Sequence, residues 1–202
     1  MAASKKPVAK SAGRPPTGQP AGEVRIIGGQ WKRSKLPVAD KPGLRPTPDR
    51  VRETLFNWLG QDLTGWRCVD AFAGTGALGF EAASRGAKEV TLVEQDAALV
   101  AQLKKIKEQL KAESVQVQRG DGIATLKASA PGSADLVLLD PPFDAGLFEP
   151  ALQAAARAVA VGGYVYLEAP SVWTEAQLAP LGLELHRHLK AGAVHAHLLR
   201  RV

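Results

Sequence analysis

The sequence predicts an α/β fold built on a doubly wound, mostly parallel sheet of seven strands with helices on both faces. Short apolar runs alternate with longer amphipathic segments from residue 68 onward, which is typical of parallel strands joined by helices. The chain has 202 residues and is 45% apolar, enough for the core of one such domain with an appendage. Such sheets bind ligands at the carboxyl ends of their strands, so residues directly after the apolar runs are the candidates for function.

The N-terminal part has the composition of a basic appendage. Residues 1–52 hold 12 of the 26 Lys and Arg residues but only three of the 20 acids, which favours a polyanionic partner such as nucleic acid. Residues 1–22 contain four cations and four prolines but no apolar core for a signal peptide. We therefore expect a disordered basic tail there.

Residues 23–60 are expected to form a β-hairpin followed by a helix. Two short apolar runs flank Gly28-Gly29, which predicts a pair of short strands with basic residues on or near them. Thr47 can cap the following helix, with Pro48 at its first position. We expect this segment to be the extension that binds the polyanion.

Residues 61–202 are expected to form the main domain. Strands are predicted at residues 69–72, 90–93, 115–118, 136–139 and 164–168, and helices at residues 77–85, 97–111, 123–127 and 148–159. Two last strands, at residues 183–189 and 194–201, flank Ala191-Gly192 and predict a C-terminal antiparallel hairpin.

The cysteine content and the hydropathy pattern indicate a cytoplasmic protein. Cys68 is the single cysteine, so the chain has no internal disulfide, and its place before an apolar run predicts a buried packing role. No uninterrupted apolar stretch reaches the ~20 residues of a membrane span. We expect a soluble protein in a reducing compartment.

The loop after the first strand of the main domain has the pattern of a nucleotide site. Gly74, Gly76 and Gly79 satisfy G-x-G-x-x-G, and Glu94 follows the next strand, where an acid can bind ribose hydroxyls. This pattern also fits a nicotinamide dinucleotide, which leaves an oxidoreductase as an alternative. Asp70, directly before the loop, favours a different ligand, because its carboxylate disfavours a pyrophosphate but can bind an ammonium group.

Acids at the ends of successive strands extend this pattern. Asp70, Glu94, Asp121 and Asp140, together with the glycine loop, resemble the class I S-adenosylmethionine-dependent methyltransferases. The resemblance implies a Rossmann-like methyltransferase domain over residues 61–202, with S-adenosylmethionine as cofactor. In that family the glycine loop lies against the methionine part, the counterpart of Glu94 binds the ribose hydroxyls, and that of Asp121 binds the adenine amino group. The expected cofactor-binding residues are Asp70, Phe72, Gly74, Gly76, Glu94, Asp121 and, as a donor to the methionine carboxylate, Thr47.

The tetrapeptide Asp140-Pro141-Pro142-Phe143 follows the apolar strand at residues 136–139. It resembles the D/N-P-P-F/Y motif of methyltransferases that act on exocyclic amino groups of nucleobases. Asp140 Oδ and the Pro141 carbonyl would each accept one amino hydrogen, which localises the nitrogen lone pair and aims it at the methyl group. Phe143 would stack on a base that is unpaired or flipped out. The expected catalytic residues are Asp140, Pro141 and Phe143.

Three further strings narrow the family. Residues 25–31 (RIIGGQW), 43–47 (GLRPT) and 49–59 (DRVRETLFNWL) resemble the bacterial ribosomal RNA methyltransferases that modify N2 of one guanine in 16S RNA. The resemblance covers about residues 24–202. It implies an enzyme that acts on 16S RNA within the small ribosomal subunit or an assembly intermediate, and we expect a monomer. The expected RNA-binding residues are Arg25, Lys32, Arg33, Lys35, Arg45, Arg50 and Arg52.

All four histidines lie in the predicted C-terminal hairpin. A two-residue turn at Ala191-Gly192 would pair His186 with His197 and His188 with His195 on one face, a geometry that could hold zinc. The family that the chain resembles requires no metal, so we expect none here.

Two alternatives to the ribosomal function remain at this stage. The tetrapeptide would also accept the amino group of adenine, as in an adenine-N6 methyltransferase that acts on DNA. A non-catalytic RNA-binding assembly factor could retain the fold, although the intact acids argue against it.

Overall fold

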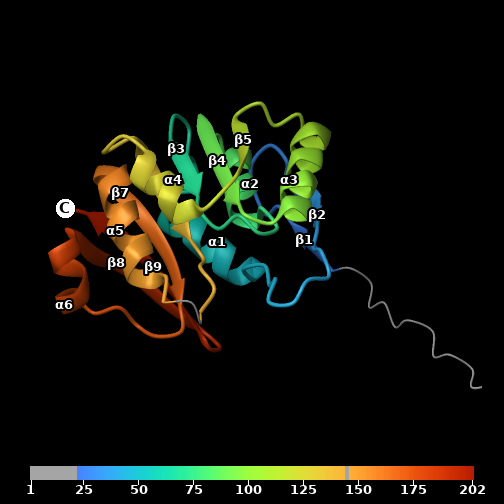
Figure 1. The fold of residues 1–202 in the computed structure, drawn as a ribbon. Coiled ribbons are helices and arrows are strands. Elements are labelled where there is room, and N and C mark those ends of the chain that lie inside the picture. Colours follow the sequence, from blue (N-terminus) through green and yellow to red (C-terminus); the bar gives the residue numbers. More distant parts are fainter. Residues whose placement is uncertain (1–21, 144–145) are drawn as a thin grey trace, which may run out of the picture.

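The computed structural model describes residues 22–143 and 146–202 (Figure 1). The tail predicted over residues 1–22 lies outside the described residues, apart from Gly22. Seven strands form one sheet in the order β5-β4-β3-β6-β7-β9-β8. Their bounds are β3 (Arg67–Asp70), β4 (Glu89–Glu94), β5 (Val115–Arg119), β6 (Ala134–Leu139), β7 (Val159–Ala169), β8 (Leu183–Ala191) and β9 (Val194–Arg201).

The predicted doubly wound topology is confirmed. Strands β3 to β7 pair in parallel, while β9 pairs antiparallel with β7 and with β8. From β3 the chain first runs outward through β4 and β5 and then returns to β6 on the other side of β3. This reversal places a topological switch point between β3 and β6, where sheets of this class bind their ligands.

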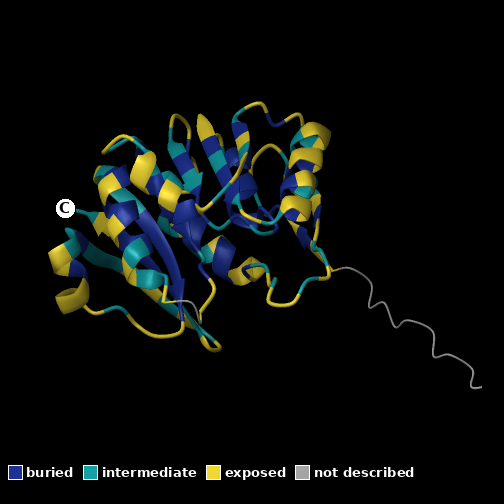
Figure 2. Cartoon of the chain, in the orientation of Figure 1, coloured by how far each residue is buried: buried dark blue, intermediate teal, exposed yellow. Residues whose placement is uncertain are grey.

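Helices cover both faces of the sheet and bury two apolar clusters. On one face, α2 (Ala77–Ser84) and α3 (Ala97–Leu110) pack with α1 (Asp49–Trp58) over residues such as Leu92 and Leu138. On the other face, α4 (Gly122–Ala128) and α5 (Phe148–Ala158) pack over residues such as Val137 and Leu167, on the near side in Figure 1. Figure 2 shows that burial is concentrated in the strands and the inner faces of the helices. Because β6 is covered on both sides, its sequence ADLVLL is almost continuously apolar.

The predicted N-terminal hairpin is present, and its helix begins differently from the prediction. Strands β1 (Glu23–Arg25) and β2 (Lys35–Pro37) pair antiparallel. Pro48 is the N-cap residue of α1, and no side chain caps this helix. The predicted capping role of Thr47 is therefore wrong; its hydroxyl is hydrogen-bonded elsewhere, as described below.

The C-terminal hairpin is confirmed, but its predicted register is wrong. Ala191 pairs with Val194, so the turn residues are Gly192 and Ala193, and Gly192 supplies the positive φ of 60°. This turn pairs His188 with His197 rather than with His195. The short helices α6 (Glu175–Leu178) and η1 (Ala179–Leu181), which precede β8, are not among the predicted elements, although Thr174 and Gln177 form a capping box at the start of α6. In the described part of the chain, no helix has the length and apolarity needed to cross a membrane.

Candidate active site

Four carboxylates lie where parallel strands end at the switch point. Asp70 ends β3, Glu94 ends β4, Asp140 follows β6 and Glu168 lies near the end of β7. The β6–β7 register pairs Leu139 with Leu167, which places Asp140 and Glu168 side by side. Side chains alternate between the faces of a strand, so these two share the face on which Leu138 and Tyr166 pack.

Asp70 has a fully enclosed oxygen that makes no hydrogen bond. The residue is 1% exposed, and its Oδ2 accepts a hydrogen bond from Gly79 N at 3.1 Å. Among the described residues, Asp70 Oδ1 is the buried side-chain oxygen or nitrogen that lacks a partner. Burial, opposed by hydrogen bonds and reinforced by the charges of Glu94 and Glu168, raises the pKa of Asp70 to about 7. A buried acceptor without a donor suits a cationic ligand such as an ammonium group.

We predict that Asp70→Asn stabilises the free protein at alkaline pH. The pKa of Asp70 is about 7 in the folded state against an ordinary 3.8, so the folded state binds this proton more tightly than the unfolded state. Its contribution to stability is fully present below pH ~4 and is lost as the pH rises through 7. The pKa shift of Asp70 corresponds to a loss of about 4 kcal/mol in the free energy of unfolding at high pH. We expect Asp70→Asn to recover about half of this loss at pH 8, because the amide NH₂ of asparagine would lack an acceptor.

Urea unfolding of wild type and Asp70→Asn at pH 5 and pH 8 measures this effect. The gain in the free energy of unfolding should be smaller at pH 5, where the folded wild type holds its proton. Equal differences at the two pH values would contradict the raised pKa.

The glycine loop between β3 and α2 is held by Glu94 and by close packing. Gly74 N donates to Glu94 Oε2 at 2.9 Å, and Asp96 N donates to Glu94 Oε1 at 2.9 Å. Gly76 has a φ of 81°, and a Cβ there would lie 2.6 Å from Phe80 Cδ2. A Cβ on Gly79 would lie 2.0 Å from Leu92 Cδ2, so a larger residue there would force this buried side chain to move.

Two other predicted cofactor residues lie on the side of α4. Asp121 caps α4 through a hydrogen bond from Ala124 N to Oδ1 at 2.7 Å, and its Oδ2 accepts from Gln95 Nε2 at 2.9 Å. Its side chain is exposed at the end of β5. Phe72 is half-buried against the apolar cluster under α4 and α5. A Cβ on Gly122 would lie 1.9 Å from the Ala71 carbonyl oxygen, so the start of α4 lies against the residue that precedes Phe72.

The tetrapeptide after β6 combines a shielded acid with an exposed ring. Asp140 is half-buried, and burial together with the charges of Glu168 and Asp70 raises its pKa well above the ordinary value. Pro141 is buried, whereas Phe143 is 41% exposed and its ring centroid lies 6.0 Å from that of Phe148. An acceptor beside an accessible aromatic face can hold a flat ring that carries an amino group.

Glu168 is a site residue that the sequence reasoning missed. It is 5% exposed, and its Oε1 accepts hydrogen bonds from Thr47 Oγ1 at 2.5 Å and from Tyr166 OH at 3.0 Å. Burial raises the pKa of Glu168, and these two hydrogen bonds oppose the rise. Its position directly after an apolar run at the carboxyl end of a strand, which Asp70 and Asp140 share, is the signal that could have identified it. Thr47 is itself buried and donates to Glu168, so its predicted role as a donor to the methionine carboxylate is corrected.

Comparison with known proteins identifies the family. A family model described as Conserved hypothetical protein 95 matches residues 24–200. The chain belongs to this family. The Ribosomal RNA small subunit methyltransferase D of Escherichia coli strain K12 is 43% identical over 183 residues, which cover 90% of this chain and 91% of that protein. The protein of the same name from Haemophilus influenzae is 48% identical over 134 residues, which cover 65% of this chain and 69% of that protein.

A solved structure supports the same assignment. The structure of yhhF from Escherichia coli matches with a TM-score of 0.78 at 40% identity, covering 89% of this chain and 98% of that one. The family membership and the Rossmann-like methyltransferase fold that the sequence motifs predicted are thereby confirmed.

Six of the seven predicted RNA-binding residues are exposed in this member of the Conserved hypothetical protein 95 family. They are Arg25, Lys32, Arg33, Lys35, Arg45 and Arg50. The prediction that the seventh residue, Arg52, binds RNA is wrong, because its side chain is completely buried. Its guanidinium donates to Glu81 Oε2 at 3.2 Å, to the backbone oxygens of Arg25 and Thr47, and to Asp49. A cation enclosed by these partners cannot contact a phosphate.

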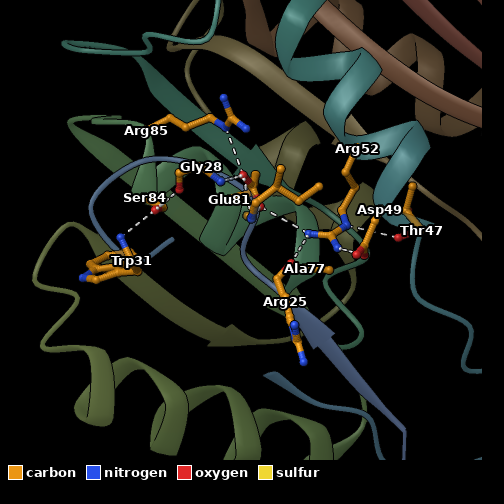
Figure 3. Close-up of polar contacts among 12 residues, drawn as sticks. Arg25, Gly28, Trp31, Thr47, Asp49, Arg52, Ala77, Glu81, Ser84 and Arg85 are labelled. Carbon is orange, nitrogen blue, oxygen red and sulfur yellow. Dashed lines mark hydrogen bonds and ion pairs between the residues drawn. The ribbon is translucent and has the colours of Figure 1, made fainter. Parts of the chain in front are cut away.

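Glu81 on α2 is the centre of this buried network (Figure 3). It is 0% exposed and accepts hydrogen bonds from Ile27 N at 2.9 Å, Gly28 N at 2.9 Å and Arg85 Nε at 3.0 Å, in addition to Arg52. Ser84, one turn further along α2, accepts from Trp31 N and donates to the Gly28 carbonyl. The strings at residues 25–31 and 49–59 thus dock the N-terminal extension on the main domain.

Among the described residues, the rings of three of the four hairpin histidines have hydrogen-bond partners, but only two of these rings bond to each other. His188 Nε2 and His195 Nδ1 are 2.9 Å apart. Both ring nitrogens of His197 have partners, since Nε2 accepts from Trp173 N and Nδ1 lies 3.2 Å from the Leu167 carbonyl. Within residues 22–143 and 146–202, no group of three or more potential ligands has the arrangement of a metal site.

Proposed function

We propose that the protein transfers a methyl group from S-adenosylmethionine to the exocyclic N2 of one guanine in 16S ribosomal RNA, in the cytoplasm. The observation that carries this proposal is the position of Asp140-Pro141-Pro142-Phe143. The tetrapeptide lies at the switch point of a methyltransferase fold, beside Asp70 with its unpartnered buried oxygen. The names of the curated relatives supply the ribosomal substrate class.

The residues at the switch point fit the parts of S-adenosylmethionine. Asp70 offers an acceptor to the ammonium group, and the loop with Gly74 and Gly76 brings the backbone close to the methionine part. Glu94 and Asp121 offer oxygens to the ribose hydroxyls and the adenine amino group. When bound, S-adenosylmethionine supplies an electrophilic methyl group.

The protein's own contribution is to orient the amino nitrogen and to shield it from water. Asp140 Oδ and the Pro141 carbonyl accept the two hydrogens of N2, so that the lone pair leaves the conjugation of the ring and points along one direction. Phe143 stacks on the base, which must leave its helix to reach the tetrapeptide. The exposed cations of residues 23–60 hold the RNA backbone, as an RNA-binding extension of the methyltransferase domain over residues 61–202.

The test is label transfer from radioactive S-adenosylmethionine to small subunits that lack the modification. We expect one labelled nucleoside, N2-methylguanosine, in 16S RNA. Label in N6-methyladenine from DNA would support the alternative enzyme instead. No transfer to any nucleic acid would leave the assembly factor as the better description.

A further inference from the structure

The carboxylate of Glu168 is fixed in place beside Asp140. Its Oε1 accepts from both Thr47 and Tyr166, at 2.5 and 3.0 Å. These donors come from two directions, because Thr47 precedes α1 and Tyr166 is two residues earlier on β7. A carboxylate held by two donors at one oxygen has little freedom to turn away.

The second oxygen of Glu168, Oε2, has no hydrogen-bond donor among the described residues. None of them donates to the carboxylate of Asp140 either. The two side chains extend from adjacent strands on the same face, and the charge of Glu168 acts directly on Asp140. The site therefore has two neighbouring carboxylates with oxygens that no described residue satisfies. A ligand with several adjacent N–H donors would satisfy them.

Guanine and adenine differ in the atom next to the reacting amino group. In guanine, N2 is adjacent to a ring nitrogen, N1, that carries a hydrogen. In adenine, N6 is adjacent to an N1 that carries a lone pair. A carboxylate facing N1 would gain a hydrogen bond from guanine but would meet a second acceptor in adenine.

We propose that Glu168 selects guanine over adenine by accepting a hydrogen bond from guanine N1 through Oε2, while Asp140 and the Pro141 carbonyl hold N2. This inference rests on the proposed function and specifies how its substrate base is chosen. The tetrapeptide alone accepts either base, so the selection comes from the neighbouring strand. Thr47 acts as a positioning residue, because it holds Oε1 and thereby directs Oε2.

The experiment compares two RNAs. Small subunits are assembled from 16S RNA that carries, at the position labelled by the wild type, either guanine or 2-aminopurine. The analogue keeps the amino group at C2 but has a lone pair in place of the hydrogen on N1. We expect the wild type to prefer guanine by about 10²-fold in kcat/KM, the usual effect of leaving one buried acceptor without its donor.

Glu168→Gln should reduce this preference to about twofold or reverse it, because the glutamine amide can donate to the lone pair of the analogue. Glu113→Gln, at an exposed acid away from the site, should keep the wild-type preference. The ratio of two rates from one preparation does not depend on the fraction of folded enzyme. A wild-type preference retained within twofold by Glu168→Gln overturns the inference while leaving the proposed function intact.

Two other outcomes are informative. If Glu168→Gln is inactive on both RNAs, Thr47→Val provides the second variant, because it removes a donor to Oε1 with little change in side-chain volume. It should lower the guanine preference several-fold, and an unchanged preference again overturns the inference. If the wild type labels no guanine N2, the proposed function fails, and Glu168 loses its assigned role with it.

Discussion

Replacing Asp140 with alanine should lower the rate of methyl transfer by about 10²- to 10³-fold, the usual cost of removing one preorganised polar group from a transition state. Asp140→Asn should cost about tenfold, since the amide oxygen still accepts one amino hydrogen where the carboxylate did. The comparison separates two roles for this residue. A hydrogen-bond acceptor is partly replaced by asparagine, whereas a general base is not.

Single-turnover label transfer to small subunits measures this difference directly. The affinity for S-adenosylmethionine, followed by calorimetry, should stay within about threefold of wild type in both variants, since Asp140 is assigned to the base. Asparagine as damaging as alanine would contradict the role as a hydrogen-bond acceptor and would favour a general base. If alanine is as active as wild type, Asp140 has no role in the reaction.

The sheet was predictable from the sequence because its signals are local. Each apolar run, such as that of β6, predicts a buried strand. An acid or glycine directly after the run indicates the edge of the sheet where ligands bind. For the same reason the sequence alone identifies Asp70 and Asp140 as candidate site residues. Glu168 carries the same signal, but its relevance depends on the β6–β7 register, which a single sequence does not reveal.

The errors concern contacts between distant parts of the chain. Arg52 lies in a basic segment near the predicted RNA-binding surface, and only the docking of α1 against α2 shows that it faces Glu81. Thr47 has the sequence context of a helix cap, yet its hydroxyl is bonded to a residue 121 positions later. The hairpin register depended on which residue takes the left-handed turn conformation, and moving Gly192 to the first turn position changes every pair.

The largest loss of stability is expected for Glu81→Ala, at about 3 to 5 kcal/mol. Breaking a buried ion pair at one partner leaves the other charge in a site without water. Arg52 is 0% exposed, and in this variant Asp49 would be its remaining acidic partner. The backbone amides of Ile27 and Gly28 would lose the carboxylate that accepts their hydrogen bonds. Glu81→Gln should cost less, because one oxygen remains for these amides.

Urea unfolding of both variants measures the loss, with Glu23→Ala as the matched control. Glu23 pairs with Lys35 at 2.9 Å, but these side chains are 47% and 58% exposed, so the control should lose less than about 1 kcal/mol. If Glu81→Ala lost as little free energy of unfolding as this control, the buried network would contribute little to the docking of the extension.

The same network should connect stability to catalysis. Arg52 Nε donates to the Thr47 carbonyl, and the Thr47 hydroxyl holds Glu168 beside Asp140. A weaker interaction between Arg52 and Glu81 should therefore let Thr47 and Glu168 move, even where the protein remains folded. We expect Glu81→Gln to lose methyl-transfer activity at temperatures well below its unfolding midpoint, whereas Glu23→Ala should lose activity only when it unfolds. If Glu81→Gln lost activity only at the temperature where it unfolds, the network that anchors the extension would act independently of the site.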